Sequence, residues 1–182
     1  MGILAVYDFS GFRTVVDVGG GTGALLSAIL QAVPSAQGVL VEQPAVLAQS
    51  RDVLAAGGVA DRCVTVGADF FDAVPTGGDL YVLSNIIHDW DDDAATRILR
   101  TCHRAMAVGA RLLIVELVLP DDTQPSPAKL LDLEMLSVTP SGRQRTAREY
   151  GTLLKAAGFR MTRVVPAVMG TPASYVEATL SA

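Results

Sequence analysis

The chain has 182 residues, half of them apolar, with a formal net charge of −5 and a mean hydropathy of +0.38. This length suits one globular domain. The charge balance provides no basic surface for nucleic acid, and no apolar run reaches the roughly 20 residues that cross a bilayer. Cys63 and Cys102 lack metal-ligand spacing, so we expect buried thiols, no metal site and a cytoplasmic protein. The high hydropathy predicts an apolar surface that a partner covers.

Short β-branched runs alternate with helical patterns over residues 14–119, which predicts βαβ units and a mainly parallel sheet. Five strands are expected, the last being the longest, at residues 14–19, 38–42, 63–67, 79–85 and 110–119. Three helices are expected between them, at residues 24–33, 43–56 and 92–107. The acids Asp91, Asp92 and Asp93 stand where they would complement the dipole at the start of the third helix.

The pattern changes after residue 119. Helices are predicted at residues 128–138 and 147–158, with Thr146 as the N-cap of the second and Gly158 as its stop. Two final strands, at residues 159–167 and 174–182, are joined by a loop that contains Gly170 and Pro172. The sequence therefore predicts an α/β fold with a seven-stranded, mostly parallel sheet that has an antiparallel C-terminal strand, and helices on both faces. The last two strands are expected together at one edge of the sheet as its antiparallel addition.

The stretch "VDVGGGTGALL" (residues 16–26) places Gly19, Gly20, Gly21 and Gly23 between a strand and a helix. Glycines there allow a sharp turn and close approach of the backbone to a ligand at the helix N-terminus. The spacing fits G-x-G-x-G, and through Ala24 it also fits the dinucleotide pattern G-x-G-x-x-A. Both patterns predict a nucleotide-type cofactor.

Four further side chains are predicted near that loop. Glu42 ends the second strand, where a carboxylate can bind both ribose hydroxyls; Asp69 follows the third strand and could accept from an adenine amino group beside Phe70. The alternative for Glu42 and Asp69 is that each caps a turn or helix. Asp17 lies within the first strand, where an unpaired charge is costly. We expect Asp17 to hold the glycine loop or to meet a cationic ligand group, such as a sulfonium or an ammonium.

The segment "SNIIHDWDDD" (residues 84–93) follows the fourth strand and contains one of only two histidines. Ligands of open α/β sheets bind beyond the carboxyl ends of the strands, so His88 is expected on the same edge as the glycine loop. Glu116 is expected near the carboxyl end of the neighbouring fifth strand, where it could orient the His88 imidazole as a general base. The alternative for His88 is that it caps the helix or bonds a carbonyl group. His103 and Trp90 are interpreted as residues without a catalytic role, Trp90 as a packing residue.

These motifs resemble the S-adenosylmethionine-dependent O-methyltransferases of the plant caffeate and bacterial polyketide type, over nearly the whole chain. The resemblance implies a Rossmann-like class I methyltransferase fold, with the donor on Gly19, Gly21, Glu42, Asp69 and Phe70. It implies that His88, assisted by Asp89 and Glu116, deprotonates a hydroxyl, phenolic in our interpretation, of a small-molecule acceptor. It also implies that Met135 and Thr139 line the acceptor pocket.

The chain departs from the family pattern in three respects. Ser84 replaces a lysine near the adenine, and Gln144 in "SGRQRT" replaces a glutamate, so it can hydrogen-bond the histidine or substrate but cannot stabilise positive charge. Family members are about twice as long and carry an N-terminal helical dimerisation domain. We therefore expect residues 1–182 to form a single donor-binding domain with that N-terminal domain absent, and a homodimer or that domain as the partner at the apolar surface.

Two other functions remain open. Gly19, Gly21, Ala24 and Glu42 also permit an NAD-dependent oxidoreductase, although the sequence has no Tyr-x-x-x-Lys pair. Alternatively, the chain is a binding module that keeps the cofactor without turnover.

Overall fold

The structure is a computed structural model that describes residues 2–139, 141–165 and 174–181. The predicted loop with Gly170 and Pro172, and the last two residues of the strand predicted at 159–167, lie outside the described residues. Among the described residues, no helix is both long enough and apolar enough to cross a membrane.

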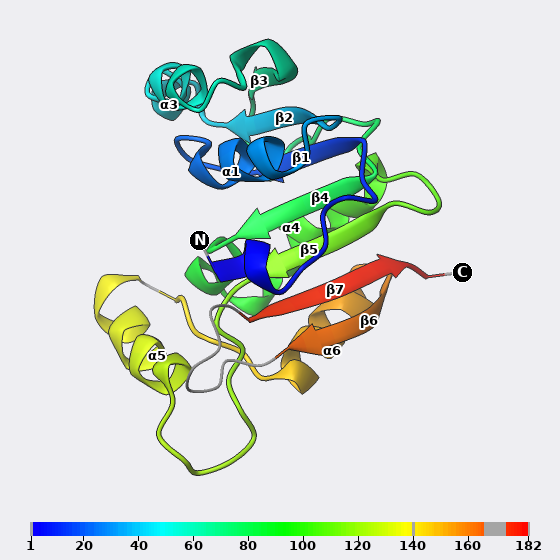
Figure 1. The fold of residues 1–182 in the computed structure, drawn as a ribbon. Helices are drawn as coiled ribbons and strands as arrows, with labels where there is room; N and C mark the ends of the chain where they lie inside the picture. Colours follow the sequence, from blue (N-terminus) through cyan, green and yellow to red (C-terminus); the bar gives the residue numbers. More distant parts are fainter. Residues whose placement is uncertain (1, 140, 166–173, 182) are drawn as a thin grey trace.

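Seven strands form one sheet in the order β3-β2-β1-β4-β5-β7-β6. Their bounds are β1 Thr14–Val18, β2 Gln37–Glu42, β3 Cys63–Gly67, β4 Leu80–Ser84, β5 Arg111–Val115, β6 Phe159–Val165 and β7 Tyr175–Leu180. Neighbours from β3 to β5 pair in parallel, and β7 pairs antiparallel with both β5 and β6. The predicted seven-stranded sheet is confirmed, with the last two strands added at one edge (Figure 1); the antiparallel strand is β7, which lies between β5 and the edge strand β6.

The helices cover both faces of the sheet (Figure 1). Their bounds, with the single-turn 3-10 helices written η, are η1 Gly2–Ala5, α1 Ala24–Ala32, α2 Pro44–Leu47, α3 Ser50–Ala56, η2 Ala60–Arg62, η3 Ile87–Asp89, α4 Asp92–Ala105, α5 Pro127–Val138 and α6 Ala147–Ala156. The predicted caps of α6 are confirmed: Thr146 forms a capping box with Glu149, and Gly158 follows the helix at φ 89°.

Two element predictions were wrong. The helix expected at residues 43–56 is broken into α2 and α3, where the hydroxyl of Ser50 donates to the carbonyl of Leu47 and the turn tightens. The fifth strand ends at Val115 instead of residue 119 and is not the longest. Beyond it the backbone bonds to loops instead of a strand: the N–H of Val118 donates to Ser174, and that of Leu119 donates to the carbonyl of Arg145.

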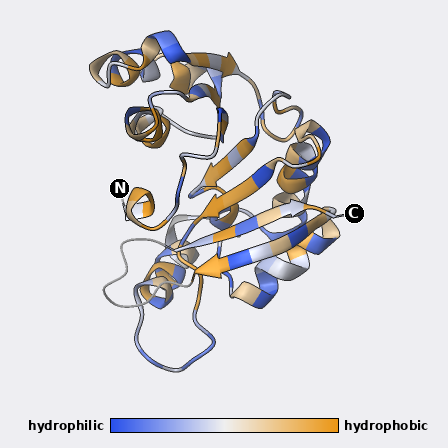
Figure 2. Ribbon diagram, turned by 45° about the vertical axis from the view of Figure 1, so that its right-hand side comes forward, coloured by the Kyte–Doolittle hydropathy of each residue, from blue (hydrophilic) through white to orange (hydrophobic). Residues whose placement is uncertain are grey.

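Alternate residues of the buried strands serve two cores, because successive side chains of a strand point to opposite faces. In β4, Leu80 and Val82 pack on the side of α1 and α3, whereas Tyr81 and Leu83 pack on the side of α4 and α6. Figure 2 shows that the central strands are mainly hydrophobic, whereas the loop before α5 is mainly hydrophilic. Such strands are buried on both faces, which explains their nearly continuous apolar runs.

The topology places two loops side by side. The chain leaves β1 toward α1 and leaves β4 toward α4, on opposite faces, although β1 and β4 are neighbours in the sheet. Ligands of such sheets bind where the strand order reverses in this way. Segment η1 lies at the same edge, beside the ends of β4 and β5 (Figure 1).

Candidate functional site

The glycine loop after β1 lines a cavity of about 290 Å³, together with Asp17, Ser84 and Asn85. Three of its glycines have left-handed backbone, with φ of 71° at Gly19, 57° at Gly21 and 79° at Gly23. A Cβ on Gly20, which is not left-handed, would overlap the carboxylate of Asp17 and the side chain of Leu40. The loop therefore needs glycine for its turns and for close approach to Asp17.

Asp17 is buried in this cavity with 1% of its surface exposed. Neither carboxylate oxygen makes a hydrogen bond of normal geometry within the protein. Burial raises the pKa of Asp17 to about 7; the charge of Glu42 adds to this, and the nearby backbone N–H of Leu26 opposes it. Of our two expectations, the structure does not support Asp17 holding the glycine loop, because the carboxylate makes no bond to it.

Glu42 and Phe70 border the glycine loop. One carboxylate oxygen of Glu42 accepts from the N–H of Gly21 at 3.0 Å, and the other from that of Gln43 at 2.7 Å. A Cβ on Gly19 would lie 3.3 Å from the ring of Phe70. Asp69 is exposed and accepts from the N–H of Phe71 at 2.8 Å, so it caps a turn. The alternative reading of Asp69 as a turn cap is thus correct for one of its oxygens.

A second cavity, of about 380 Å³, adjoins the first. The two share Leu25, Ser84 and Asn85 in their linings. The second also reaches Ile3 of η1, Glu116 and four further apolar or small side chains, Ala24, Val115, Leu117 and Ser174. A ligand on the glycine loop and a second molecule could thus share the carboxyl edge of the sheet.

His88 lies in η3 and is 8% exposed. Its Nδ1 lies 2.9 Å from the side-chain Nε2 of Gln144, and its Nε2 lies 3.5 Å from Oδ1 of Asp89. The prediction that Gln144 can reach the histidine is confirmed. The ring of His88 contacts the side chain of Asp89, its neighbour in η3, and that of Gln144, from the loop before α6, so it does not act as a helix cap.

Glu116 follows β5 and is fully buried, as expected, but the prediction that it orients the imidazole directly is wrong. Its Oε1 accepts from the backbone N–H groups of Ile86, Ile87 and His88, at 3.1, 2.6 and 3.2 Å. Its Oε2 accepts from the hydroxyl of Tyr150. Burial raises the pKa of Glu116, while the charge of His88 and these hydrogen bonds oppose the rise. The carboxylate of Glu116 therefore interacts with the His88 ring only electrostatically, whereas it hydrogen-bonds the His88 backbone directly.

Met135 and Thr139 stand at the end of α5. Met135 is buried, and the hydroxyl of Thr139 donates to the carbonyl of Met135 and accepts from the N–H of Gly142. The linings of the two cavities, as far as the structure describes them, include neither residue. Thr139 thus closes the helix and starts the loop that carries Gln144.

Three residues of the site were missed from the sequence. Arg145 is completely buried beside the His88 loop, and Tyr150 reaches Glu116 from α6. Asn85 has φ 54° at the junction of the two cavities. Asparagine directly after a strand was a usable signal, because it adopts left-handed backbone more easily than most residues. Nothing in the sequence marks a loop arginine or a helical tyrosine as buried.

The remaining predictions concern structural residues. Cys102 is buried as expected, but Cys63 is only half-buried; both are free, and burial raises their pKa values to about 12 and about 11. Trp90 packs edge-on against Phe71, and the ring of His103 packs edge-on against Phe159. The described residues contain no group of three or more His, Cys, Asp or Glu that could hold a metal ion.

Comparison with known proteins shows the fold and the family of the chain. The fold is that of the class I methyltransferases: the crystal structure of LaPhzM superimposes with a TM-score of 0.91 at 49% identity, over 98% of this chain and 53% of that one. The O-methyltransferase domain family matches residues 1–160, and the chain belongs to that family.

Two other relatives are informative. Phenazine O-methyltransferase PhzM of Lysobacter antibioticus is 51% identical over 176 residues, which cover 97% of this chain and 51% of that protein. NcsB1, an O-methyltransferase from neocarzinostatin biosynthesis, was solved with S-adenosylmethionine and 2-hydroxy-5-methyl naphthoic acid; its TM-score is 0.86 at 35% identity, over 98% of this chain and 52% of that one. The chain thus spans about half the length of the relatives it matches.

Asp17 generates a prediction about stability. Its folded pKa of about 7 exceeds its ordinary value of 3.8, so its ionisation destabilises the folded state increasingly as pH rises from 4 to 7. Asp17→Asn should raise the free energy of unfolding at pH 8, by up to about 4 kcal/mol, and by much less at pH 5. Urea unfolding at both pH values measures this, with the exposed Asp72→Asn as control. An equal effect of Asp17→Asn at both pH values would contradict the prediction.

Proposed function

We propose that this domain binds S-adenosylmethionine on the glycine loop and transfers its methyl group to a hydroxyl, phenolic by preference, of a small aromatic molecule. One observation carries the proposal: His88, with its ring in contact with Gln144 and Asp89, follows the strand next to the one that leads into the glycine loop. Membership of the O-methyltransferase domain family supports it, and no comparison supports the NAD-dependent alternative.

The residues around the first cavity suit this donor. Asp17 is a buried carboxylate without a hydrogen-bond partner in the protein, and an ammonium or sulfonium would supply the missing charge. Glu42 would bind the ribose hydroxyls, with Phe70 beside the adenine, Asp69 accepting from its amino group through its second oxygen, and Ser84 on the cavity wall. When bound, the donor supplies an electrophilic methyl group on sulfur.

The base would be Nε2 of His88. The Oε1 atom of Gln144 is buried without a partner, whereas its amide nitrogen faces Nδ1 of His88. Rotating the amide by 180° places Oε1 beside Nδ1, where it accepts a hydrogen bond from the Nδ1–H of the imidazole. That tautomer leaves Nε2 free to take the hydroxyl proton, with the Asp89 carboxylate beside it to stabilise the imidazolium.

The energetics make that support necessary. A phenol has a pKa near 10 and an imidazole near 6.5, so complete transfer before methylation costs about 5 kcal/mol. The negative charges of Asp89 and of the buried Glu116 reduce this cost, and proton transfer concurrent with methyl transfer reduces it further. Gln144 orients the ring without adding charge. Met135 and Thr139 would shape the acceptor side from the end of α5.

Donor binding can be measured by calorimetric titration with S-adenosylhomocysteine and, separately, with NAD. We expect binding of the first and none of the second, and about tenfold or more weaker binding in Glu42→Ala, because a charge-assisted hydrogen bond is lost. Asp52→Ala, an exposed acid on α3, is the control. Binding of NAD alone would overturn the proposed cofactor.

The role of His88 can be tested against the only other histidine in the sequence. His88→Asn should lower the rate of methyl transfer to phenolic acceptors by about 100-fold or more, because it removes a general base, while leaving the affinity for S-adenosylhomocysteine unchanged. His103→Asn should leave both unchanged. Donor binding by the wild-type chain without any transfer would instead support a binding module without turnover.

We further propose that residues 1–182 act as a single donor-binding domain whose partner, a second copy or the helical N-terminal domain of the family, covers α5. Leu130 and Leu133 lie one turn apart on α5 and are 71% and 65% exposed. Two exposed leucines at this spacing form an apolar stripe that water solvates poorly.

A cytoplasmic location is proposed from the two free thiols, and cell fractionation that finds the protein elsewhere would contradict it.

Self-association tests this surface. Leu130→Ser with Leu133→Ser should abolish any concentration-dependent association of the wild-type chain in sedimentation velocity. The pair Val64→Ser and Val108→Ser, at valines that are 63% and 96% exposed elsewhere on the protein, should leave association unchanged. A wild-type chain that remains monomeric at all concentrations excludes the second copy, and unchanged association in the leucine variant excludes this surface.

A further inference from the structure

We propose that Glu116 and Arg145 form a two-sided clamp on residues 86–90 that fixes the position of the His88 imidazole, with Tyr150 holding Glu116 in place. Neither Arg145 nor Tyr150 needs to contact a substrate, so both would be positioning residues. The proposal deepens the function proposed above, because the clamp matters for catalysis only if His88 is the base.

The anionic side of the clamp binds N–H groups. After the left-handed turn at Asn85, the N–H groups of Ile86, Ile87 and His88 all point to Oε1 of Glu116. Successive N–H groups converging on one anion form a binding concavity of the kind that proteins use for phosphates. Here the anion belongs to the protein, and the hydroxyl of Tyr150 donates to its other oxygen.

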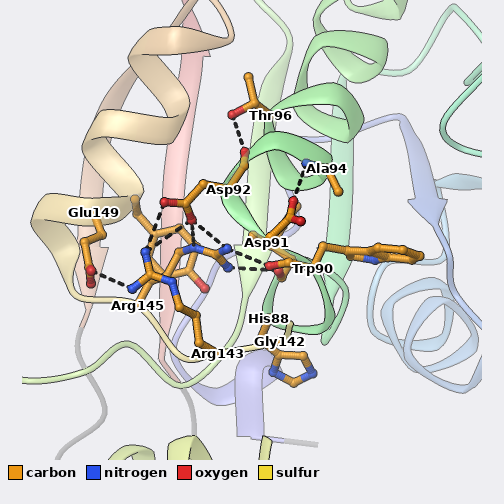
Figure 3. A network of polar contacts seen from close by, with 12 residues as sticks. His88, Trp90, Asp91, Asp92, Ala94, Thr96, Gly142, Arg143, Arg145 and Glu149 are labelled. Carbon is orange, nitrogen blue, oxygen red and sulfur yellow. Dashed lines mark hydrogen bonds and ion pairs between the residues drawn. The ribbon is translucent and has the colours of Figure 1, made fainter. Parts of the chain in front are cut away.

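The cationic side binds carbonyl groups of the same segment (Figure 3). The Nη1 of Arg145 donates to the carbonyl of Ile87 at 2.9 Å, and its Nη2 donates to the carbonyl of Trp90 at 2.7 Å. Its Nε and Nη2 also bind Oδ1 of Asp92 at 3.0 and 2.9 Å, at the start of α4. The planar fork of an arginine spreads its donors over three nitrogens in fixed directions, which suits three separate acceptors, whereas the donors of a lysine all lie on one nitrogen.

Both backbone polar groups of His88 are hydrogen-bonded. Its N–H donates to Glu116, and its carbonyl accepts from the backbone N–H of Arg143, two residues before Arg145, at 2.8 Å. The side chain of Arg145 is 0% exposed, and burying a charge is costly unless its hydrogen bonds are satisfied. Two such charges on opposite sides of one short loop are explained by the need to hold it in one conformation.

Amide hydrogen exchange tests the clamp without requiring activity. In Tyr150→Phe and Arg145→Lys, exchange of the amides of residues 86–88 should accelerate by about tenfold or more relative to the global opening rate, because each variant weakens one side. Tyr81→Phe is the control for the first, since Tyr81, like Tyr150, is 0% exposed, and its hydroxyl donates to the carbonyls of Pro75 and Ala105. Arg62→Lys is the control for the second, since Arg62 also binds two carbonyls, of Ala36 and Leu30.

Methyl transfer, measured on the same variants, gives the second readout. We expect kcat to fall by about tenfold or more in Tyr150→Phe and Arg145→Lys, with the affinity for S-adenosylhomocysteine unchanged, because a displaced base lowers the rate without affecting the donor. Exchange that accelerates equally throughout the chain, or equally in the controls, would overturn the clamp and leave the two residues as general stabilisers. If exchange accelerates locally in the two variants but the wild-type chain transfers no methyl group, the clamp is supported and the proposed function is rejected.

Discussion

The buried carboxylate of Glu116 is the interaction on which the candidate site depends. It stands at the end of β5, one strand away from the loop that it binds, and it collects three consecutive N–H groups of that loop. A desolvated carboxylate is unfavourable by itself, so these bonds and the hydroxyl of Tyr150 are what make its position tolerable. Because the carboxylate is tied to the sheet, the His88 loop takes its position from the sheet as well.

Asp17 on β1, two strands from β5, shows the opposite arrangement. Its oxygens make no hydrogen bond within the protein, and burial raises the pKa of its carboxyl to about 7. Such a group reduces the stability of the folded protein near neutral pH, and binding sites are where proteins tolerate this cost. The two acids thus mark two parts of the carboxyl edge of the sheet. Around Glu116 the hydrogen bonds are made within the protein, whereas the surroundings of Asp17 suit a cationic ligand.

Much of this arrangement could be predicted from the sequence, because it depends on local patterns. The βαβ alternation predicted the sheet, and strand ends located the glycine loop, Glu42 and His88 on one edge. The prediction that strands β4 and β5 are neighbours was correct, but the carboxylate of Glu116 binds the backbone of the His88 loop and not the imidazole, so its role was predicted wrongly. A pattern of residues predicts where a strand ends. Whether the Glu116 carboxylate binds the imidazole or three backbone N–H groups depends on how the loop after β4 turns at Asn85.

The sequence by itself determined the fold class, the cofactor-type loop and the histidine, since periodicity and glycine spacing follow from the geometry of single helices, strands and turns. Only the tertiary structure decided how the histidine is held. Arg145 and Tyr150 come from segments more than 50 residues beyond His88, and their burial beside the His88 loop results from the docking of α6 and its preceding loop on α4. A charged side chain such as that of Arg145 becomes buried only when segments distant in the sequence pack together, and a local sequence pattern does not predict that packing.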